Sequence, residues 1–211
     1  DGPWTPLNQI VIPNGGEGEW DQYSIHDPYP LVHDGKIYLY YKSDFSKQDA
    51  KRGLVRMHGL EIADNPLGPF KKHALNPILA AGHETTLFPF KEGVAAIVQR
   101  DGQEHNTIQY AKDWVNFEIA SVVELMPNAA GFYAPDVFTD TKYGRGVTWG
   151  ISHFTQPKGW ENNHSILTRF DTDLSLDLHD PEMKKHNNKY YSISSSKLSI
   201  MISFSVSLTF I

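Results

Sequence analysis

The chain has 211 residues and a formal net charge of −6, and 40% of its residues are hydrophobic, 21% charged and 12% aromatic. This composition suffices for a globular core, and the acidic balance (pI near 5.9) argues against a nucleic-acid or membrane-surface role, which would need a basic patch. The sequence contains no cysteine, which excludes disulfides and thiol chemistry.

Three non-identical units follow one another along the chain, and an acidic residue begins each of them. The acids are Asp27, Glu84 and Asp136, separated by 57 and 52 residues. After each acid the sequence predicts a short apolar strand, a turn with glycine, and a second strand rich in β-branched or aromatic residues. The predicted strand pairs are 27–32 with 37–41, 84–90 with 94–98, and 136–140 with 147–151.

The second halves of the first two units also correspond to each other. Residues 59–70 and residues 108–117 each predict a strand, an Asp-led turn and an outer strand. Residues 1–4 look like the same turn from a preceding unit, and only short segments such as 46–52 suit a helical turn. A period of roughly 40–60 residues with several strands per repeat is typical of a β-propeller, so the sequence predicts an all-β fold.

The end of the chain differs from the repeats, so we expect a partial propeller over 1–183 and an atypical Ser-rich tail over 184–211. Residues 202–210 alternate between apolar and hydroxyl side chains, which predicts a strand with one apolar face. This stretch is too short and too polar for a membrane span. It either supplies a missing blade edge or is a foreign end, and its serine content favours the second interpretation.

The repeated acids indicate glycoside hydrolysis. That reaction needs one carboxyl to protonate the leaving oxygen and another to activate water or attack, and a further acid nearby raises the pKa of the donor. In a propeller the innermost strand of each blade lines the central depression, so Asp27, Glu84 and Asp136 would point into one pocket. The structural alternatives are a turn-opening Asp27, a solvated loop Glu84 and a merely structural Asp136.

Histidines and aromatic residues give a second set of candidates. His26, His83, His105 and His153 all fall next to predicted strand ends, where a histidine binds a sugar hydroxyl, holds a cation at the propeller axis, or serves only structure. Trp149 and Trp20 are candidate sugar-stacking residues, although most aromatics fill the gaps between blades. No HExxH or CxxC spacing is present, so the sequence does not indicate a catalytic metal.

Six motifs follow one another along the chain, at 24–28, 39–42, 59–70, 76–78, 82–84 and 149–153. In this order they resemble glycoside hydrolase family 117, whose characterised members are α-1,3-L-(3,6-anhydro)galactosidases, or neoagarobiose hydrolases. The resemblance runs from about residue 1 to about residue 183. It implies a five-bladed β-propeller, related in architecture to family 43 arabinanases and xylosidases, of which about three blades are present.

The resemblance also implies catalytic roles for individual residues. Asp27 falls on the family's second catalytic-site Asp, which tunes or positions the acid. His83 and Glu84 fall on the adjacent pair implicated in proton donation, and which of the two is the acid stays open. The family's general base is an Asp in a first blade that no part of this sequence matches. The expected substrate contacts are His26, Lys42, Asp136, His153 and Trp149.

The leading functional hypothesis is an exo-acting hydrolase that releases 3,6-anhydro-L-galactose from the non-reducing end of neoagaro-oligosaccharides during agar degradation. The alternatives are a related, family 43-like glycosidase acting on another α-linked sugar and a non-catalytic, truncated sugar-binding propeller. We expect an oligosaccharide partner, neither nucleic acid nor membrane, and no cofactor, with a structural divalent cation at the axis and a homodimer left open. Localisation is open between the periplasm and the cytoplasm of a polysaccharide-degrading bacterium.

Overall fold

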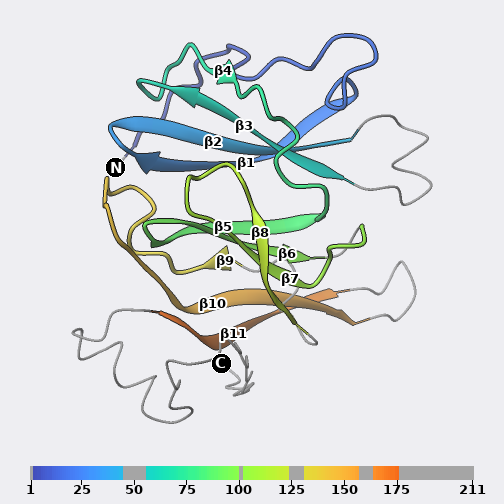
Figure 1. Ribbon diagram of the computed structural model, residues 1–211. Coiled ribbons are helices and arrows are strands. Elements are labelled where there is room, and N and C mark those ends of the chain that lie inside the picture. The colour runs from blue at the N-terminus through green and yellow to red at the C-terminus, as the bar shows by residue number, and fades with distance from the viewer. Residues whose placement is uncertain (1, 45–55, 100–101, 124–130, 157–163, 176–211) are drawn as a thin grey trace.

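The computed structural model describes residues 2–44, 56–99, 102–123, 131–156 and 164–175, and this part of the chain is all-β (Figure 1). The segment 46–52 and the tail 184–211 lie outside these ranges. None of the described residues form a helix long and apolar enough to cross a membrane. The strands are β1 (Ser24–His33), β2 (Lys36–Asp44), β3 (Met57–Ala63), β4 (Lys71–Lys72), β5 (Glu84–Lys91), β6 (Gly93–Gln99), β7 (Thr107–Ala111), β8 (Glu118–Val122), β9 (Gly131–Phe132), β10 (Gly144–Gln156) and β11 (His164–Ser175).

The first two units each form a four-stranded antiparallel meander, as the strand pattern predicts. The first sheet has the order β1-β2-β3-β4. The second unit repeats this order as β5-β6-β7-β8, which we call the second sheet; β5 also pairs with β10, so that β11, β10, β5–β8 and β9 form one seven-stranded array. Asp34 and Gly35 connect β1 to β2 with positive φ angles of 50° and 69°, the conformation of a tight hairpin turn. Asp140, from the third unit, accepts hydrogen bonds from the backbone N–H groups of both turn residues at 2.7 Å.

The Asp-led turns of the second halves are confirmed, and their side chains explain them. Asn65 Oδ1 accepts a hydrogen bond from the backbone N–H of Leu67 at 2.9 Å, between β3 and β4. Asp113 Oδ1 accepts hydrogen bonds from the backbone N–H groups of Val115 at 3.0 Å and Asn116 at 2.8 Å, between β7 and β8. In both units, hydrogen bonds from backbone N–H groups to a short polar side chain take the place of strand-to-strand hydrogen bonds, and the chain reverses direction there.

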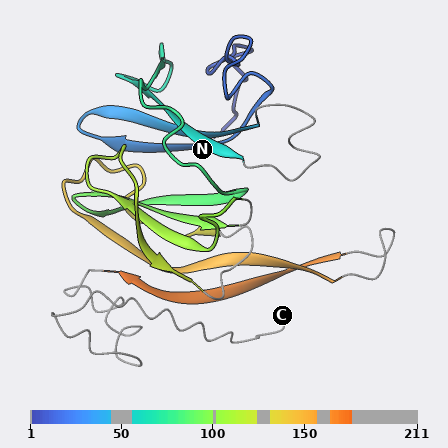
Figure 2. The ribbon, with the colours of Figure 1, turned by 45° about the vertical axis from the view of Figure 1, so that its right-hand side comes forward.

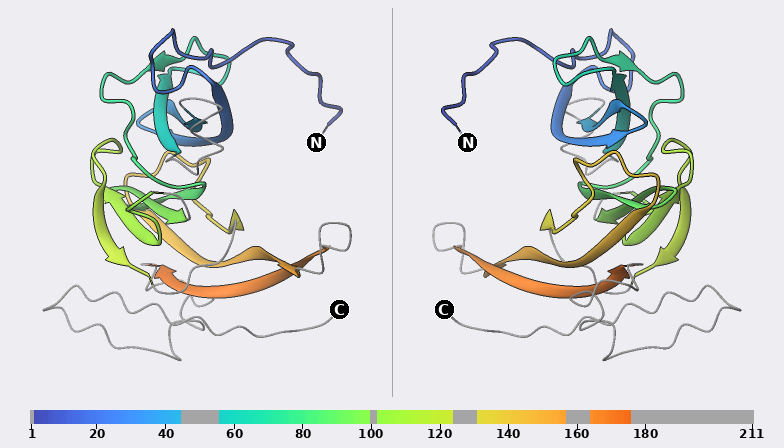
Figure 3. Two further views of the ribbon diagram at one scale, coloured as in Figure 1. Left: turned by 90° about the vertical axis from the view of Figure 1, so that its right-hand side faces the viewer. Right: turned by 90° about the vertical axis from the view of Figure 1, so that its left-hand side faces the viewer.

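The layers stack on one another, with the first sheet on β5–β8 and the β10–β11 hairpin on the other side (Figures 2 and 3). One core cluster joins the first sheet to the second, and another joins the second sheet to β10 and β11. All seven residues of β6 are buried, because both faces of this strand are covered. We call the packed interface between the first and second sheets the seam.

The third unit departs from the sequence prediction. The run 136–140 does not form a strand, since a turn occupies 135–138 and the short β9 precedes it. Asp136 explains the difference: its carboxylate accepts a hydrogen bond from the backbone N–H of Arg145 at 2.7 Å, and its carbonyl accepts one from Thr139 Oγ1 at 3.1 Å. These local bonds satisfy the backbone in a compact loop rather than in a ladder.

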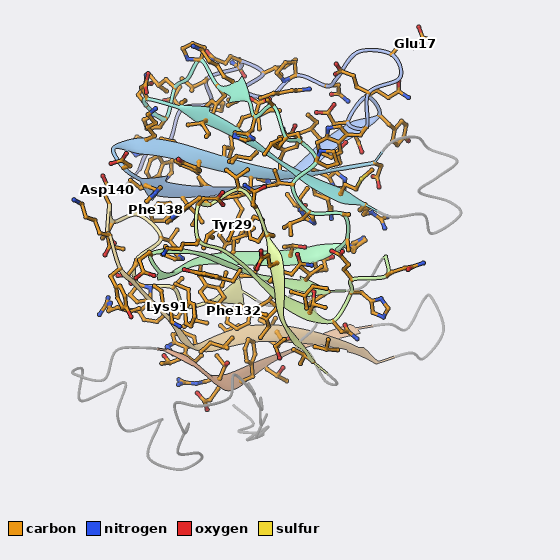
Figure 4. All side chains as sticks on the ribbon, in the orientation of Figure 1. Glu17, Tyr29, Lys91, Phe132, Phe138 and Asp140 are labelled. Atoms are coloured by element: carbon orange, nitrogen blue, oxygen red, sulfur yellow. The ribbon has the colours of Figure 1, made fainter. Side chains whose placement is uncertain are left out.

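Aromatic contacts fix one end of the seam. The His33 and Trp114 rings stack with centroids 4.0 Å apart, and Tyr40 donates a hydrogen bond to the Trp114 carbonyl at 2.8 Å. Tyr29 lies between the two sheets (Figure 4), where burial raises its pKa to about 12. The sheets are therefore held at a fixed spacing, and the opposite end of the seam is where the candidate residues meet.

Candidate active site

Four strand ends meet at one end of the seam: the start of β1, the end of β2, the start of β3 and the start of β5. Side chains alternate between the two faces of a strand, so Tyr40, Lys42 and Asp44 of β2 share one face. Tyr40 lies in the core of the seam, and Lys42 is only 2% exposed. The same face thus continues from an apolar core into a row of charged groups.

Asp27 lies at an irregularity of β1. The pairing of β1 with β2 shifts register between His26 and Tyr29, and Asp27 has a positive φ of 52°. A bulge of this kind re-aims a side chain out of the regular alternation, at some cost in backbone strain. The Asp27 carboxylate remains about half exposed, at 54%, so a ligand can reach it.

Lys42 joins Asp27 to the second sheet. Its ammonium forms a salt bridge with the Asp27 carboxylate and donates a hydrogen bond to the His83 carbonyl at 2.7 Å. Burial alone raises the pKa of Asp27, but the hydrogen bond and charge of Lys42 outweigh it, so the pKa lies below its usual value. Asp27 is therefore ionised at neutral pH and cannot serve as the proton donor.

His83 and Glu84 form a close pair at the start of β5. His83 Nδ1 lies 2.6 Å from Glu84 Oε1, and each side chain is 29% exposed. Burial lowers the pKa of His83, Lys42 and Arg56 lower it further, and Glu84 opposes the shift. The imidazole is therefore mainly neutral at neutral pH, and Glu84 is its immediate acidic neighbour.

Four further charged or polar groups extend this cluster: Ser24, His26, Asp44 and Arg56. Asp44 Oδ2 lies 3.2 Å from His26 Nε2 and accepts a hydrogen bond from Ser24 Oγ at 3.1 Å. Asp44 Oδ1 lies 3.2 Å from Arg56 Nε. His26 Nδ1 in turn lies 4.0 Å from Asp27 Oδ1. His26 therefore contacts Asp44 within hydrogen-bond distance and lies close to Asp27 on its other side.

A solved structure decides the family. The structure of Zg3597, a family 117 glycoside hydrolase produced by the marine bacterium Zobellia galactanivorans, is 57% identical, with a TM-score of 0.75. The similarity covers 88% of this chain and 53% of that one. The chain belongs to glycoside hydrolase family 117. It spans about half the length of the family 117 protein that it matches.

More distant structures are also similar to this family 117 chain. The GH43 protein BlXynB from Bacillus licheniformis is 12% identical, over 72% of this chain and 28% of that one, with a TM-score of 0.42. The endo-arabinase from Bacteroides thetaiotaomicron is 16% identical, over 75% and 60% of the two chains, with a TM-score of 0.43. Neither the protein-family models nor the curated proteins compared with the sequence match it.

The structure brings together Asp27, His83, Glu84, His26 and Lys42, but it places Asp136 elsewhere. Arg145 binds the Asp136 carboxylate and pairs with Phe90, near the far end of β5 from Glu84. That end is about 20 Å from Glu84 along a strand with a rise of about 3.3 Å per residue. The expectation that all three acids share one pocket therefore fails for Asp136, whose carboxylate instead holds the start of β10.

Two other expected contacts belong to the third unit. Trp149 stacks on Tyr133 with centroids 5.3 Å apart, and the Arg169 guanidinium lies 4.8 Å from its ring centroid. The backbone of His153 pairs with Leu167 in β11, and its side chain is outside the described residues. Trp20, the other candidate sugar-stacking residue, stacks on Tyr41. The Tyr41 side chain lies on the opposite face of β2 from Lys42, because successive side chains of a strand alternate between its faces.

Sequence reasoning missed Asp44, Arg56 and His58. Asp44 follows Lys42 by two residues and so shares its face, which the strand period could have indicated. His58 pairs with Lys42 across strands, a relation that depends on register and is not visible in the sequence. Within the described ranges, no three His, Asp or Glu residues are grouped as ligands of a metal ion.

Proposed function

We propose that this protein is an exo-acting glycosidase that releases 3,6-anhydro-L-galactose from the non-reducing end of neoagaro-oligosaccharides. The observation that carries the proposal is the meeting of an ionised Asp27 with the His83–Glu84 pair, through Lys42, at one end of the seam. Membership of family 117 supports the reaction class. We also propose that the stacked meanders are about three blades of a five-bladed propeller.

The roles follow from the protonation states. A glycosidase needs a protonated donor beside the leaving oxygen and a negative charge beside the oxocarbenium-like sugar. Lys42 holds the pKa of Asp27 below its usual value, so Asp27 supplies the negative charge and orients the donor. We assign the role of proton donor to Glu84, with His83 as its immediate partner, because His83 Nδ1 lies 2.6 Å from Glu84 Oε1.

Substitution of each pair member separates the two donor assignments. Glu84→Gln removes the acid while keeping its shape, and we expect kcat to fall by about 10²–10⁴-fold. Asp27→Asn should cause a comparable loss by removing the charge. Glu92→Gln, on the exposed β5–β6 turn, is the matched control and should leave kcat unchanged. Near-full activity in Glu84→Gln with an inactive His83→Ala would instead identify His83 as the donor.

A hybrid protein tests the function as a whole. The chain replaces its aligned segment in Zg3597, which supplies the part of the family protein that the chain does not span. Hydrolysis of neoagarobiose and longer neoagaro-oligosaccharides is followed by chromatography of the released sugars, beside arabinosides and carrageenan- or porphyran-derived oligosaccharides. Single anhydrogalactose units released from one end support the proposal. Turnover of another sugar alone corrects the substrate, and binding without turnover refutes the enzyme.

A further inference from the structure

His58 is a buried histidine at the start of β3 to which the reaction chemistry above gives no role. It is 4% exposed and pairs with Lys42 in the β2–β3 ladder. Its backbone N–H donates to the Leu79 carbonyl at 2.9 Å, and its carbonyl accepts from the Ile78 N–H at 2.9 Å. The chain that leads into β5 is thus attached to His58 before it reaches His83 and Glu84.

The imidazole of His58 contacts the residues on both sides of His83 and Glu84, which we call the donor pair. Nε2 lies 3.0 Å from the Gly82 carbonyl oxygen and 2.9 Å from Thr85 Oγ1. A carbonyl oxygen only accepts hydrogen bonds, so Nε2 carries the hydrogen and shares it between these two oxygens. Gly82 and Thr85 directly flank His83 and Glu84, so this one N–H group fixes the two ends of a four-residue segment.

The segment adopts a conformation that needs such support. Gly82 has a positive φ of 102°, and a Cβ atom there would lie 2.3 Å from Thr85 Oγ1. On the other side of the segment, Lys42 donates to the His83 carbonyl at 2.7 Å. The position of the donor pair relative to Asp27 therefore depends on two hydrogen-bond donors that neighbour each other across β2 and β3.

We propose that His58 is a positioning residue: its Nε2–H holds the segment from Gly82 to Thr85 so that the His83–Glu84 pair faces Asp27. This inference rests on the proposed function of that pair. Orientation errors of about 1 Å in a catalytic group can cost about 10²-fold in rate, so a fixed backbone at this point has a large effect. Burial lowers the pKa of His58 to about 4, so the ring is neutral throughout the neutral range and Nε2–H is its single N–H donor.

Two variants of His58 in the hybrid protein separate positioning from packing. His58→Gln keeps an amide N–H close to the place of Nε2, whereas His58→Leu removes the donor and keeps an apolar filling. We expect kcat to fall about 10–100-fold in His58→Leu with KM changed less than about threefold, and His58→Gln to recover most of the loss. The alkaline limb of kcat/KM should move only in His58→Leu, because the donor pair loses its fixed surroundings.

A measurement without turnover distinguishes failure of this inference from failure of the proposed function. NMR titration of the His83 ring in the chain itself reports its surroundings. In His58→Leu the pKa of His83 should rise toward the ordinary histidine value, because the ring leaves its partly buried place beside Lys42 and Arg56. His58→Gln and the exposed control His105→Leu should leave it unchanged.

An unchanged His83 titration and an unchanged pH profile in a folded His58→Leu variant would overturn the inference. If circular dichroism shows that His58→Leu does not fold, His58→Asn takes its place. That side chain is polar but too short for its amide to reach the Gly82 carbonyl and Thr85. Wild-type behaviour of His58→Asn would equally refute a positioning role.

Discussion

The buried His58 should make the stability of the chain depend on pH in a way that one substitution removes. The pKa of His58 falls from its ordinary 6.5 to about 4 in the folded chain, first because of burial and then because of the Lys42 charge, against the hydrogen bond to Gly82. Between these values the unfolded chain binds the proton and the folded chain does not. Stability is therefore fully present above pH 6.5 and is lost as the pH falls toward 4.

The size of the effect follows from the shift. A difference of about 2.5 pKa units corresponds to about 3 kcal/mol well below about pH 4, where both states bind the proton, and to about 2 kcal/mol at about pH 5. His58→Gln keeps the donor to Gly82 but does not titrate. It should therefore lose about 2 kcal/mol less free energy of unfolding than the unsubstituted chain between about pH 7.5 and about pH 5.

Urea unfolding at the two pH values, followed by tryptophan fluorescence at one protein concentration, measures this difference. His33 and His83, whose pKa values burial also lowers, contribute a slope of the same sign in both proteins, so the comparison isolates His58. Equal pH dependence in the two proteins would refute the reasoning. It would mean that His58 is solvated or already protonated in the folded chain.

Three further outcomes are expected. Lys42→Met lets burial raise the pKa of Asp27, so the acidic limb of kcat/KM in the hybrid protein should move to higher pH, and an unmoved limb would contradict the role of Lys42. Gly82→Ala should lower the free energy of unfolding by about 1–3 kcal/mol, because φ of residue 82 is positive and the added Cβ would clash with Thr85. Urea unfolding measures this difference, and an unchanged free energy of unfolding would contradict this geometry. The chain by itself should self-associate, because the apolar side chains on segment 2–11 are largely exposed. Light scattering should then give a mass above that of one chain, and a monodisperse monomer would count against this prediction.

The strand pattern predicts the first two units well because local signals agree there. Alternation, Gly-bearing turns and Asp-led turns all indicate the same strands, and hydrogen bonds of Asn65 and Asp113 confirm the turns. The third unit shows the limit of the repeat argument. Asp136 occupies the corresponding sequence position, yet Arg145 captures its carboxylate and the loop replaces a strand. An equivalent position in the repeat does not give an equivalent structure where a nearby residue of the loop, here Arg145, binds the acid.

The meeting of Asp27 with His83 and Glu84 could be predicted from the sequence, but the residues that surround them could not, and Asp136 lies elsewhere. Asp27, His83 and Glu84 stand out because charged residues at strand starts are unusual and fall on family motifs. Lys42 was expected to contact substrate, whereas the structure buries it between Asp27 and the His83 carbonyl. Whether a lysine in a strand is a ligand or an internal bridge depends on which sheet packs against that face. That information is absent from local sequence.

The hydrogen bonds of Asp140 to the Asp34–Gly35 turn have a kinetic consequence. They join residues 106 and 105 positions apart, and the loop that they close contains the whole second sheet. Closing so long a loop is costly in entropy until the intervening strands are in place, so these bonds should form after the folding transition state. Their loss should then accelerate unfolding while leaving the folding rate almost unchanged, which makes this contact between the first and third units a determinant of how long the folded chain persists.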